Sequence, residues 1–502
     1  MNRYRFALAG ILAVGLGFTT MVSAQSPEGP NFAPPPGAYP APPPAPAAAA
    51  NDGEVLTKGA IHEAFAQPLT AQPTAGPVAP RTPPKVIEEL PPEEKPNNDT
   101  AMWIPGYWNW DADKNDFVWV SGVWRIPPPG HQWVPGYWNQ VATGYQWISG
   151  AWISNQIQEV QYLADPPKTN YERGPNAPSP GPDHFWVPGN YMWTGTEYAW
   201  RPGHWQQAYA DWIWVPATYV WTPSGWIFVE GHWDQTIANR GMVFCPMYYA
   251  QPFYLRAGYY YRPSIVVTPD ILTFHFFCSP YNHHYYFGDY YDDSYVRAGI
   301  IVPWYDAGRY YGVVDPMYAY YRWHYVRTDP EWEIHLHGWH DYYALHREFR
   351  PAPTFALELS LRGRPGHDRF VIGLSFAEMH RDPRWGGQMH GISREEQMHI
   401  HEQVREFRTF HEERARLEGH GVPGRPGERM QLARMPGHES LAKQLPPAAR
   451  EKLAHPTTAV AAHPTAPVAG RPVAPVPGKP ATAKPATAAK PKPKDSKDSN
   501  SR

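Results

Sequence analysis

Trp103-Ile-Pro-Gly-Tyr-Trp108 and Trp119-Val-Ser-Gly-Val-Trp124 open a repeat that decides the fold of this chain. The same six-residue unit, W-x-x-G-x-W, returns at Trp133 and at Trp147. More degenerate units start at Trp186, Trp200, Trp214 and Phe228. Successive units within each block start at equal intervals, except that Trp103 and Trp119 lie slightly further apart. A regular step of this kind indicates a repeat architecture, so the organisation of the chain is read from it first.

The units fall into pairs, and each pair predicts a β-hairpin. The arms are rich in Trp, Tyr, Val and Ile, and turn residues connect them, most clearly in Thr222-Pro-Ser-Gly225. Proline has no N–H to donate to a neighbouring strand, so the hairpins are expected to stack or fan out rather than form one continuous sheet. A bulge at the Pro-Gly step would bring both tryptophans of a unit to one face. The prolines at this step are Pro105, Pro135, Pro188 and Pro216.

The repeats hold 18 of the 23 tryptophans, and two interpretations of them stay open. They are the core of a thin repeat protein with few aliphatic residues, or some stand exposed as platforms for sugar rings or peptides. On the second interpretation the binding candidates are Trp108, Trp138, Trp205 and Trp233.

The four clean units resemble the YXWGXW (W-x-x-G-x-W) repeat family of secreted bacterial proteins. The second block departs from that pattern, because Tyr191 and Tyr219 replace the final tryptophan and Ala217 replaces the glycine. The resemblance covers about a quarter of the chain. It implies an extracytoplasmic setting and no established activity.

The N-terminal residues 1–24 predict a secretory signal peptide, with basic residues at the start, an apolar run and a small-residue cleavage site. We therefore expect export to the periplasm, the cell surface or the medium. After cleavage, no apolar stretch reaches the length that a transmembrane helix needs. Residues 25–100 predict a Pro-rich disordered arm with a short helical motif at 56–66. That motif either docks on the Trp-rich body or serves as a linear motif for a partner.

Composition divides the rest of the chain. The predicted segments are repeat block 1 at 101–152, a linker at 153–185, repeat block 2 at 186–240, a Tyr/His-rich region at 241–391, a helix at 392–418, and a Pro/Ala/Lys-rich disordered tail at 419–502. A capping box at Ser393–Glu396 and the stop residue Gly419 predict the helix. The expected fold class is mainly β: Trp-rich repeated hairpins, then a Tyr-rich β or α+β region, one C-terminal helix, and long disordered ends.

The Tyr/His-rich region contains several candidate strands and both cysteines. Polar and apolar residues alternate in Glu331–His337, which predicts a strand. Phe355–Leu361 and Phe370–Phe376 are candidates for a hairpin. Cys245 and Cys278 form a disulfide or remain as two buried thiols, since an exported chain permits either state.

Two clusters contain possible metal ligands. His335, His337 and His340 are imidazoles of the kind that bind Zn, Cu or Ni, but the sequence favours a solvated polar strand face over a metal site, so they are weak candidates. The segment from Asp111 to Asn115 matches the start of a calcium loop. Its sixth position is Asp116 instead of glycine and no glutamate closes it, so the sequence favours a polar hairpin turn and no metal.

No motif for catalysis or cofactor binding is present. The chain lacks H-E-x-x-H, G-x-S-x-G, a P-loop and a dinucleotide fingerprint, so no catalytic residue and no cofactor is assigned. The formal net charge of −3 gives no reason to expect nucleic acid. We expect an exported, non-catalytic structural or interaction protein of the cell envelope, with cell-wall or extracellular polysaccharide or an envelope protein as partner. The alternative is a carbohydrate- or cell-wall-binding module that uses exposed Trp and Tyr. An enzyme of unknown class in 241–376 is a third, less favoured, interpretation.

Overall fold

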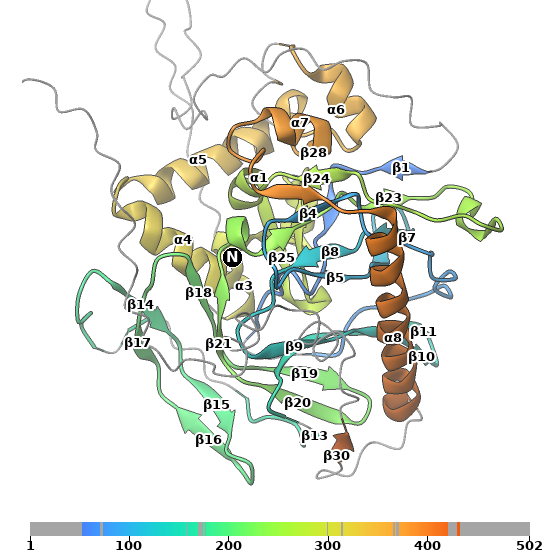
Figure 1. Ribbon diagram of the computed structural model, residues 1–502. Helices are drawn as coiled ribbons and strands as arrows, with labels where there is room; N and C mark the ends of the chain where they lie inside the picture. Colours follow the sequence, from blue (N-terminus) through green and yellow to red (C-terminus); the bar gives the residue numbers. More distant parts are fainter. Residues whose placement is uncertain are drawn as a thin grey trace, which may run out of the picture. The chain divides into compact units, whose positions relative to one another are not determined.

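In the computed structural model the W-x-x-G-x-W units form short antiparallel strands, with helices and further short strands around them (Figure 1). All described residues belong to one unit of the chain, Met1–Pro456. The fold class expected from the sequence, mainly β with repeated Trp-rich hairpins, is confirmed. The structure describes residues 53–70, 74–157, 159–168, 174–175, 177–298, 300–312, 315–364, 367, 371–419 and 429–431.

Each repeat of two units folds into two consecutive strand pairs. In repeat 1, β6 (Tyr107–Asp111) and β7 (Asp116–Val120) form the inner pair, and β5 (Met102–Ile104) and β8 (Val123–Arg125) form the outer pair. Between the pairs, both strands are interrupted at the same level, at the Pro-Gly step on one side and the Ser-Gly step on the other. A matched interruption therefore takes the place of the bulge that we expected.

The other three repeats follow the same plan of an inner and an outer pair. Repeat 2 consists of β9 (His131–Val134), β10 (Tyr137–Val141), β11 (Gly144–Ile148) and β12 (Ala151–Ser154). Repeat 3 consists of β14 (His184–Val187), β15 (Asn190–Trp193), β16 (Tyr198–Arg201) and β17 (His204–Gln207). Repeat 4 consists of β18 (Trp212–Val215), β19 (Thr218–Thr222), β20 (Gly225–Val229) and β21 (His232–Gln235).

This plan explains the spacing of the tryptophans. Trp103 faces Trp124 in the outer pair, and Trp108 faces Trp119 in the inner pair. Both couples are T-shaped, with ring centroids 5.3 Å apart, an arrangement that aromatic rings favour. The two tryptophans of one unit therefore belong to different strand pairs, and each meets a tryptophan of the other unit.

The glycine of each unit makes room for an indole ring. A Cβ atom on Gly122 would lie 2.4 Å from Cζ2 of Trp103 and 2.7 Å from the carbonyl oxygen of Ile104. Both distances are too short for a Cβ atom, so only glycine fits at this position without a shift of its neighbours. In repeat 4 the glycine and the tryptophan of one such contact are both replaced. There Ala217 stands at the glycine position and Phe228, which is smaller than tryptophan, at the position whose ring would cover it.

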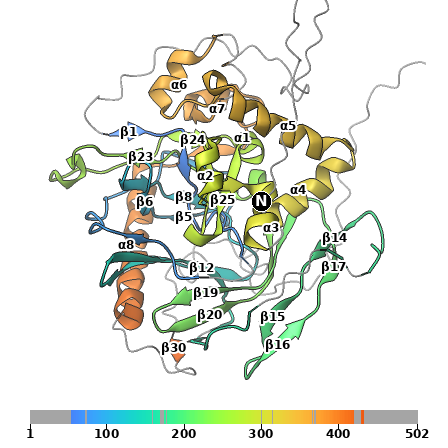
Figure 2. The same cartoon turned by 180° about the vertical axis from the view of Figure 1, so that it is seen from behind.

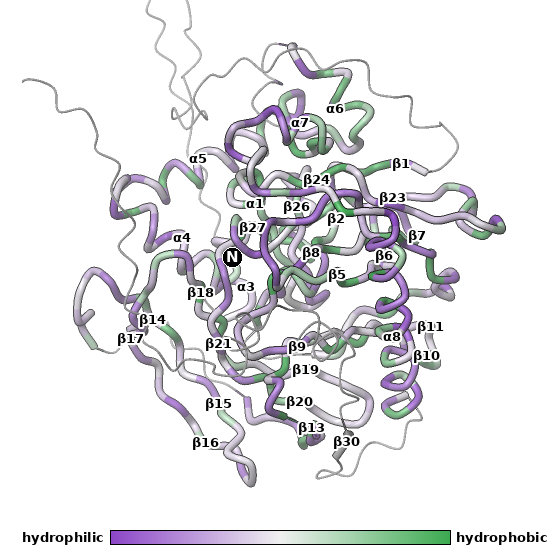
Figure 3. The backbone as a smooth tube through the Cα atoms, viewed as in Figure 1, coloured by the Kyte–Doolittle hydropathy of each residue, from purple (hydrophilic) through white to green (hydrophobic). Residues whose placement is uncertain are grey.

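Strands of different repeats do not join into one sheet within the described part of the chain, as the prolines predicted. Short strands from elsewhere add to the hairpin edges instead: β23 (Met247–Tyr248) pairs with β7, and β22 (Gly241–Met242) with β8. The β15–β16 hairpin lies at the margin of the described structure in both views (Figures 1 and 2). Along that hairpin the tube is mostly pale or purple, whereas the greener stretches lie around the more central strands (Figure 3).

The described part of the N-terminal arm is structured, so the prediction of disorder over 25–100 is wrong for 53–70 and 74–100. The predicted helix at 56–66 is also wrong. This segment contains β2 (Gly59–Ala60) and a turn, because its backbone pairs with β26 (His284–Phe287) instead of with itself. Ile61 and Phe65 are buried, which confirms docking on the body of the same chain. Other strands of the arm are β1 (Glu54–Val55), β3 (Val78–Ala79) and β4 (Glu94–Pro96).

Parts of the predicted linker and tail are structured as well. In the linker, β13 (Glu159–Gln161) pairs with β30 (Arg429–Gln431) from the tail. Leu163 forms an isolated bridge with Trp226 of repeat 4. The predicted signal peptide, 1–24, and most of the tail lie outside the described residues.

The Tyr/His-rich region is α+β and contains more helix than we expected. Glu331–His337 was predicted as a strand, but α5 (Trp332–Leu345) buries Trp332, Leu336, His340 and Tyr343, which follow helical spacing. The predicted hairpin is also wrong, because α6 (Phe355–Leu361) is a helix and β28 (Gly373–Ser375) pairs with β24 (Ile265–Val267). Further elements are α1 (Pro269–Phe274), β25 (Phe276–Ser279), α2 (Asp293–Arg297), β27 (Val302–Pro303), α3 (Ala307–Tyr311), α4 (Pro316–Val326), α7 (Phe376–Arg381) and β29 (Met389–Gly391).

The C-terminal helix is confirmed as α8 (Arg394–Gly419). The backbone N–H of Glu396 donates to Oγ of Ser393 at 3.1 Å, as the capping box predicted. Val404 and Phe407 are buried and form its apolar side. The helix packs against β10 of repeat 2, beside the first block (Figure 1).

Candidate interaction surface and the carboxylates beneath the repeats

The two repeat blocks differ in how deeply their tryptophans are buried. In block 1, seven of the nine tryptophans are buried, whereas in block 2 only Trp226 of nine is buried. Trp200 in β16 is 37% exposed, and Trp193 and Trp205 are half-buried around it. Block 1 is therefore a core, and block 2 leaves part of its aromatic surface uncovered in the described structure.

Helix α8 covers block 1 from one side. The Arg414 side chain donates to the carbonyl oxygens of Pro135 (2.7 Å) and Ser149 (3.0 Å) at the two strand breaks of repeat 2. Glu418 accepts hydrogen bonds from the hydroxyls of Tyr137 (2.8 Å) and Tyr162 (3.0 Å). These buried polar contacts tie the helix to the interrupted strands, where backbone groups lack a strand partner.

The N-terminal arm covers block 1 with a buried glutamate. One oxygen of Glu89 accepts from the indole N–H of Trp119 (3.3 Å) and from the backbone N–H of Gly122 (3.0 Å). The other oxygen accepts from the backbone N–H of Gly106 (2.8 Å). The carboxylate thus satisfies the N–H groups that the strand breaks of repeat 1 leave without a strand partner.

A second glutamate of the arm repeats this contact at repeat 2. Glu63 accepts from the indole N–H of Trp147 (2.7 Å) and from the backbone N–H of Gly150 (3.0 Å). Trp147 and Gly150 hold the same positions in their unit as Trp119 and Gly122. We call this arrangement the carboxylate clamp. It consists of the first tryptophan and the glycine of the second unit of a repeat, whose N–H groups both donate to one glutamate. Burial raises the pKa of Glu63 and of Glu89 to about 7, and the N–H donors of each clamp act against that rise.

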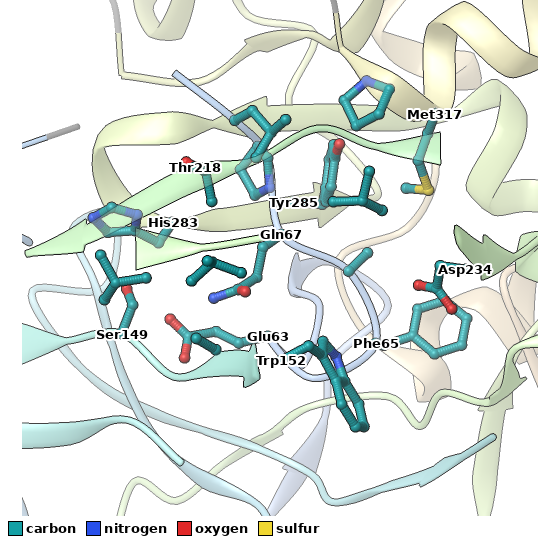
Figure 4. A pocket seen from close by; sticks show the side chains of 18 of the residues that line it. Glu63, Phe65, Gln67, Ser149, Trp152, Thr218, Asp234, His283, Tyr285 and Met317 are labelled. Atoms are coloured by element: carbon teal, nitrogen blue, oxygen red, sulfur yellow. The ribbon is translucent and has the colours of Figure 1, made fainter. Parts of the chain in front are cut away.

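A small cavity lies beside Glu63 (Figure 4). Its volume is about 60 Å³, and Gln67, Ser149, His283 and Tyr285 are among the side chains that line it. In Figure 4 the side chain of Gln67 points toward those of Glu63 and Ser149. A volume of this size holds a few water molecules, whereas pockets for small organic ligands have about 300–1,000 Å³. The cavity is therefore too small for an organic substrate.

The grouping that most resembles a catalytic site surrounds Glu63. The Tyr107 hydroxyl lies 2.7 Å from Nε2 of His284 and accepts from the backbone N–H of Glu63 at 3.0 Å. Burial lowers the pKa of His284 to about 3, so the imidazole is neutral at pH 7. Each of these polar groups already has a partner within the protein, and the cavity beside them offers no room for a reacting molecule. The geometry fits a structural network.

A larger cleft of about 390 Å³ lies between the arm, β22 and the segment around α7. Met242, Met379, Met389 and Trp385 form part of its apolar wall. Amide side chains, including Asn239, add polar groups. The lining contains no Asp, Glu, His, Lys, Arg, Cys, Tyr, Ser or Thr, so it offers no side chain for acid–base or nucleophilic chemistry.

The three candidate metal ligands do not converge. His335 Nδ1 lies 3.0 Å from Asp329 Oδ2. His337 stacks on Tyr305 with ring centroids 4.2 Å apart. His340 is buried, with Nε2 3.1 Å from the carbonyl oxygen of Phe274. The helix turns these side chains in different directions, whereas a strand would have placed His335 and His337 on one face. No group of three metal-binding side chains occurs among the described residues.

The other predicted site residues have the following positions. Cys245 and Cys278 are both buried free thiols, so of the two alternatives the disulfide is not formed. Asp111 Oδ1 accepts from the backbone N–H groups of Asp113 (2.9 Å) and Lys114 (3.0 Å), which makes the segment a polar hairpin turn.

The candidate platform tryptophans are less open than the second interpretation requires. Trp108 is only 4% exposed, so it is part of the core and cannot serve as a platform. Trp138, Trp205 and Trp233 are half-buried, and each meets a partner tryptophan edge-on. Sequence reasoning missed Trp200, whose ring is the most exposed of the repeat tryptophans.

Comparison with known families supports the repeat assignment. A family model described as the WXXGXW repeat matches residues 102–125, 129–152, 181–206 and 210–233. These segments are WXXGXW repeats. The matched ranges coincide closely with the four WXXGXW repeats defined above by their strands. Searches of curated proteins and of solved structures returned no match to the chain.

The sequence analysis also did not identify the two clamp glutamates as site residues. Glu63 and Glu89 lie in a Pro-rich arm that composition marks as disordered. The available signal was local: both glutamates have apolar neighbours, in Ile61-His-Glu-Ala-Phe65 and in Ile87-Glu-Glu-Leu90. Such apolar islands in a Pro-rich arm indicate segments that pack on the WXXGXW repeats.

Proposed function

We propose that the chain is an exported, non-catalytic interaction protein of the cell envelope and that WXXGXW block 2 is its contact surface. The observation that carries the proposal is the contrast in burial: the arm and α8 cover block 1, while block 2 keeps Trp200 exposed. Exposed clusters of Trp and Tyr are typical of binding surfaces, because their rings bury much apolar area and keep a polar group for hydrogen bonds.

Two further observations support an interaction role over catalysis. The cavity beside Glu63 is too small for a substrate, and the larger cleft has an uncharged lining. None of the described helices combines the length and the apolar character needed to cross a membrane. Export itself rests on the predicted signal at 1–24.

The carbohydrate-binding alternative is favoured by the same exposed ring. Trp200 is 37% exposed and meets Tyr191 edge-on at 5.1 Å between centroids. A ring held in this way has a face with which it can stack on a sugar. The alternative and the main proposal differ in the ligand and share the surface.

The test is retention of the full-length chain by isolated cell envelopes and by a glycan array. The variant Trp193→Ala/Trp200→Ala removes two aromatic rings of repeat 3. The matched control is Tyr260→Ala, since Tyr260 is 49% exposed and lies outside the WXXGXW repeats. We expect the double variant to lose retention at least tenfold and the control to keep it. Equal retention of both variants would rule out block 2 as the contact surface, and binding to glycans alone would favour the alternative.

Localisation needs a separate measurement. Fractionation of cells that produce the full-length chain should place it outside the cytoplasm, with the first residues removed. A protein that stays in the cytoplasm with its N-terminus intact would refute export.

A further inference from the structure

We propose that the larger cleft, between the N-terminal arm, β22 and the segment around α7, binds an uncharged sugar. Neither Trp193 nor Trp200 lines this cleft, so it is separate from the contact surface assigned to block 2. The inference goes beyond the proposed function and stands or falls independently of it. It rests on the volume of the cleft, its apolar floor and its amide side chains.

Segments that are far apart in the sequence build the cleft. The arm contributes the residues that follow β4, and repeat 4 contributes those that follow β21, while β22, β24, α1 and β29 supply most of the rest. Strand β24 pairs with β28, and α7 follows β28 directly, so α1, β24 and α7 lie together in both views (Figures 1 and 2). The volume of about 390 Å³ falls within the range of sites for small organic ligands, about 300–1,000 Å³.

The floor of the cleft is apolar and ordered before any ligand enters. Its main side chains are between 3% and 8% exposed and belong to one core cluster with Trp103 of repeat 1. A preformed wall of this kind loses little conformational entropy on binding. Methionine side chains adapt to an uneven surface, such as the C–H face of a sugar ring. The floor residues are Met242, Met379, Trp385 and Met389.

The polar side chains of the cleft are all amides. An amide group both donates and accepts hydrogen bonds, and a hydroxyl group does the same. Several hydroxyls of one sugar can therefore pair with such a lining in either direction. The five amides belong to Asn97, Asn98, Gln235, Asn239 and Gln388.

Most of these amide groups are available to a ligand. Gln235 and Asn239 make no side-chain hydrogen bond within the described part of the chain. Nε2 of Gln388 donates to a backbone carbonyl oxygen at 2.8 Å, which leaves its Oε1. Oδ1 of Asn98 accepts from the hydroxyl of Thr100 at 2.7 Å, which leaves its Nδ2. The lining thus offers donors and acceptors together.

Asn97 holds two sides of the cleft together. Its Nδ2 donates to the carbonyl oxygen of Gly387 at 2.7 Å, and its Oδ1 lies 2.7 Å from Nδ1 of His390. Beside this contact, β4 of the arm pairs with β29. The distance between the arm and β29 is therefore fixed by hydrogen bonds at both levels.

The absence of charge in the lining decides the class of ligand. None of the lining side chains is Asp, Glu, His, Lys or Arg. An ionic ligand would give up hydration without meeting an opposite charge, which is unfavourable. A purely apolar ligand would leave the amides without partners, which is unfavourable as well. A neutral sugar avoids both costs, because its ring covers the floor and its hydroxyls pair with the amides.

The first test titrates the full-length chain at neutral pH with N-acetylglucosamine, with the cationic glucosamine and with the anionic glucuronate. These sugars share a six-membered ring with the same ring hydroxyl arrangement and differ in charge. Isothermal titration calorimetry measures each affinity. We expect N-acetylglucosamine to bind at least tenfold more tightly than either charged sugar. No binding of N-acetylglucosamine, or equal binding of all three, would overturn the proposal.

Two variants locate the binding site. Ala238 is exposed and lines the cleft, so Ala238→Trp should obstruct it and lower the affinity for N-acetylglucosamine at least tenfold. The matched control is Ala298→Trp, at an exposed alanine outside the cleft, which should bind like the wild type. Unchanged binding in Ala238→Trp would overturn the assignment to the cleft.

A change of charge tests the selection of neutral sugars. Asn239→Asp places a carboxylate in the lining and should reverse the preference, weakening N-acetylglucosamine and strengthening glucosamine by about tenfold each. Asn155→Asp is the matched control, because Asn155 is exposed and lies outside the cleft. The same preference in both variants as in the wild type would refute the role of the uncharged lining.

The block 2 variant separates this site from the proposed function. Trp193→Ala/Trp200→Ala leaves the cleft lining unchanged and should bind N-acetylglucosamine like the wild type. Loss of sugar binding in that variant alone would move the sugar to block 2 and overturn the cleft. If the variant loses envelope retention while the wild type binds no sugar, the proposed function stands and the cleft proposal fails.

Discussion

Gly122→Ala, alone and combined with Trp103→Phe, tests whether the glycine of the WXXGXW repeat exists to admit an indole ring. The new Cβ would lie 2.4 Å from the Trp103 ring, so the single variant must displace that ring. Inserting a methyl group into a packed core typically costs about 1–3 kcal/mol. Trp103→Phe alone should also cost about 1–3 kcal/mol, because Trp103 is 3% exposed and a cavity remains. It removes no hydrogen bond, since the Trp103 indole N–H has no partner.

The double variant places at the second-unit glycine and the first-unit tryptophan the same Ala and Phe combination that repeat 4 contains at its first-unit glycine position, Ala217, and its second-unit tryptophan position, Phe228. Trp103→Phe relieves the clash of the new methyl group with the ring but not its contact with the carbonyl oxygen of Ile104. We therefore expect the two costs together to fall short of their sum by at least about 1 kcal/mol, a coupling typical of residues in contact. Urea unfolding followed by tryptophan fluorescence measures all four proteins. The matched control for the added methyl group is Gly387→Ala, where a Cβ would meet nothing within 4 Å. Additive costs within about 0.5 kcal/mol would refute this account of the glycine.

Three further outcomes follow from the buried groups. Glu89→Ala should lower the free energy of unfolding at pH 7 by at least about 3 kcal/mol, since three buried N–H donors lose their acceptor. The control is Glu88→Ala, which removes a carboxylate that is 46% exposed and should cost less than about 1 kcal/mol. Similar costs for the two variants would contradict the clamp. Stability should fall as the pH drops from about 6.5 to 5, by about 2 kcal/mol for each histidine whose pKa burial lowers to about 3 or 4. Glu63, Glu89 and Asp315, whose pKa burial raises to about 7, 7 and 6, act oppositely but are fewer than these histidines. Urea midpoints that rise toward pH 5 would refute this balance. Cys245 and Cys278 should react with a thiol reagent only after unfolding and without prior reduction. The histidines are His62, His232, His283, His284, His340 and His411.

The repeat architecture was predictable because it depends on local chemistry. Proline at one fixed site excludes a continuous sheet, and the turn residues of each hairpin are adjacent in the sequence. Helix α8 was predictable for the same reason, because its capping box and its stop residue lie at its two ends in the sequence. These elements were placed almost to the residue.

The failures concern segments whose structure is decided by distant partners. Residues 56–66 have a helical pattern, but their backbone pairs with β26, which lies far along the chain beyond all four repeats. Glu331–His337 alternates like a strand and also has helical spacing, and packing of Trp332 and Leu336 decides for the helix. Glu63 and Glu89 could not be found as site residues, because their receptors are created only when two W-x-x-G-x-W units pair.

The crossed order of the N-terminal arm constrains how this chain reaches its final state. Glu63 comes first in the chain yet serves repeat 2, and Glu89 comes later yet serves repeat 1, so the two segments must pass one another on the way to their clamps. Glu418 then joins Tyr137 across 281 positions of the chain. Contacts of such long range are formed slowly, because the chain between them must first be closed into a loop. The first block therefore cannot complete its packing until Glu418 has been synthesised.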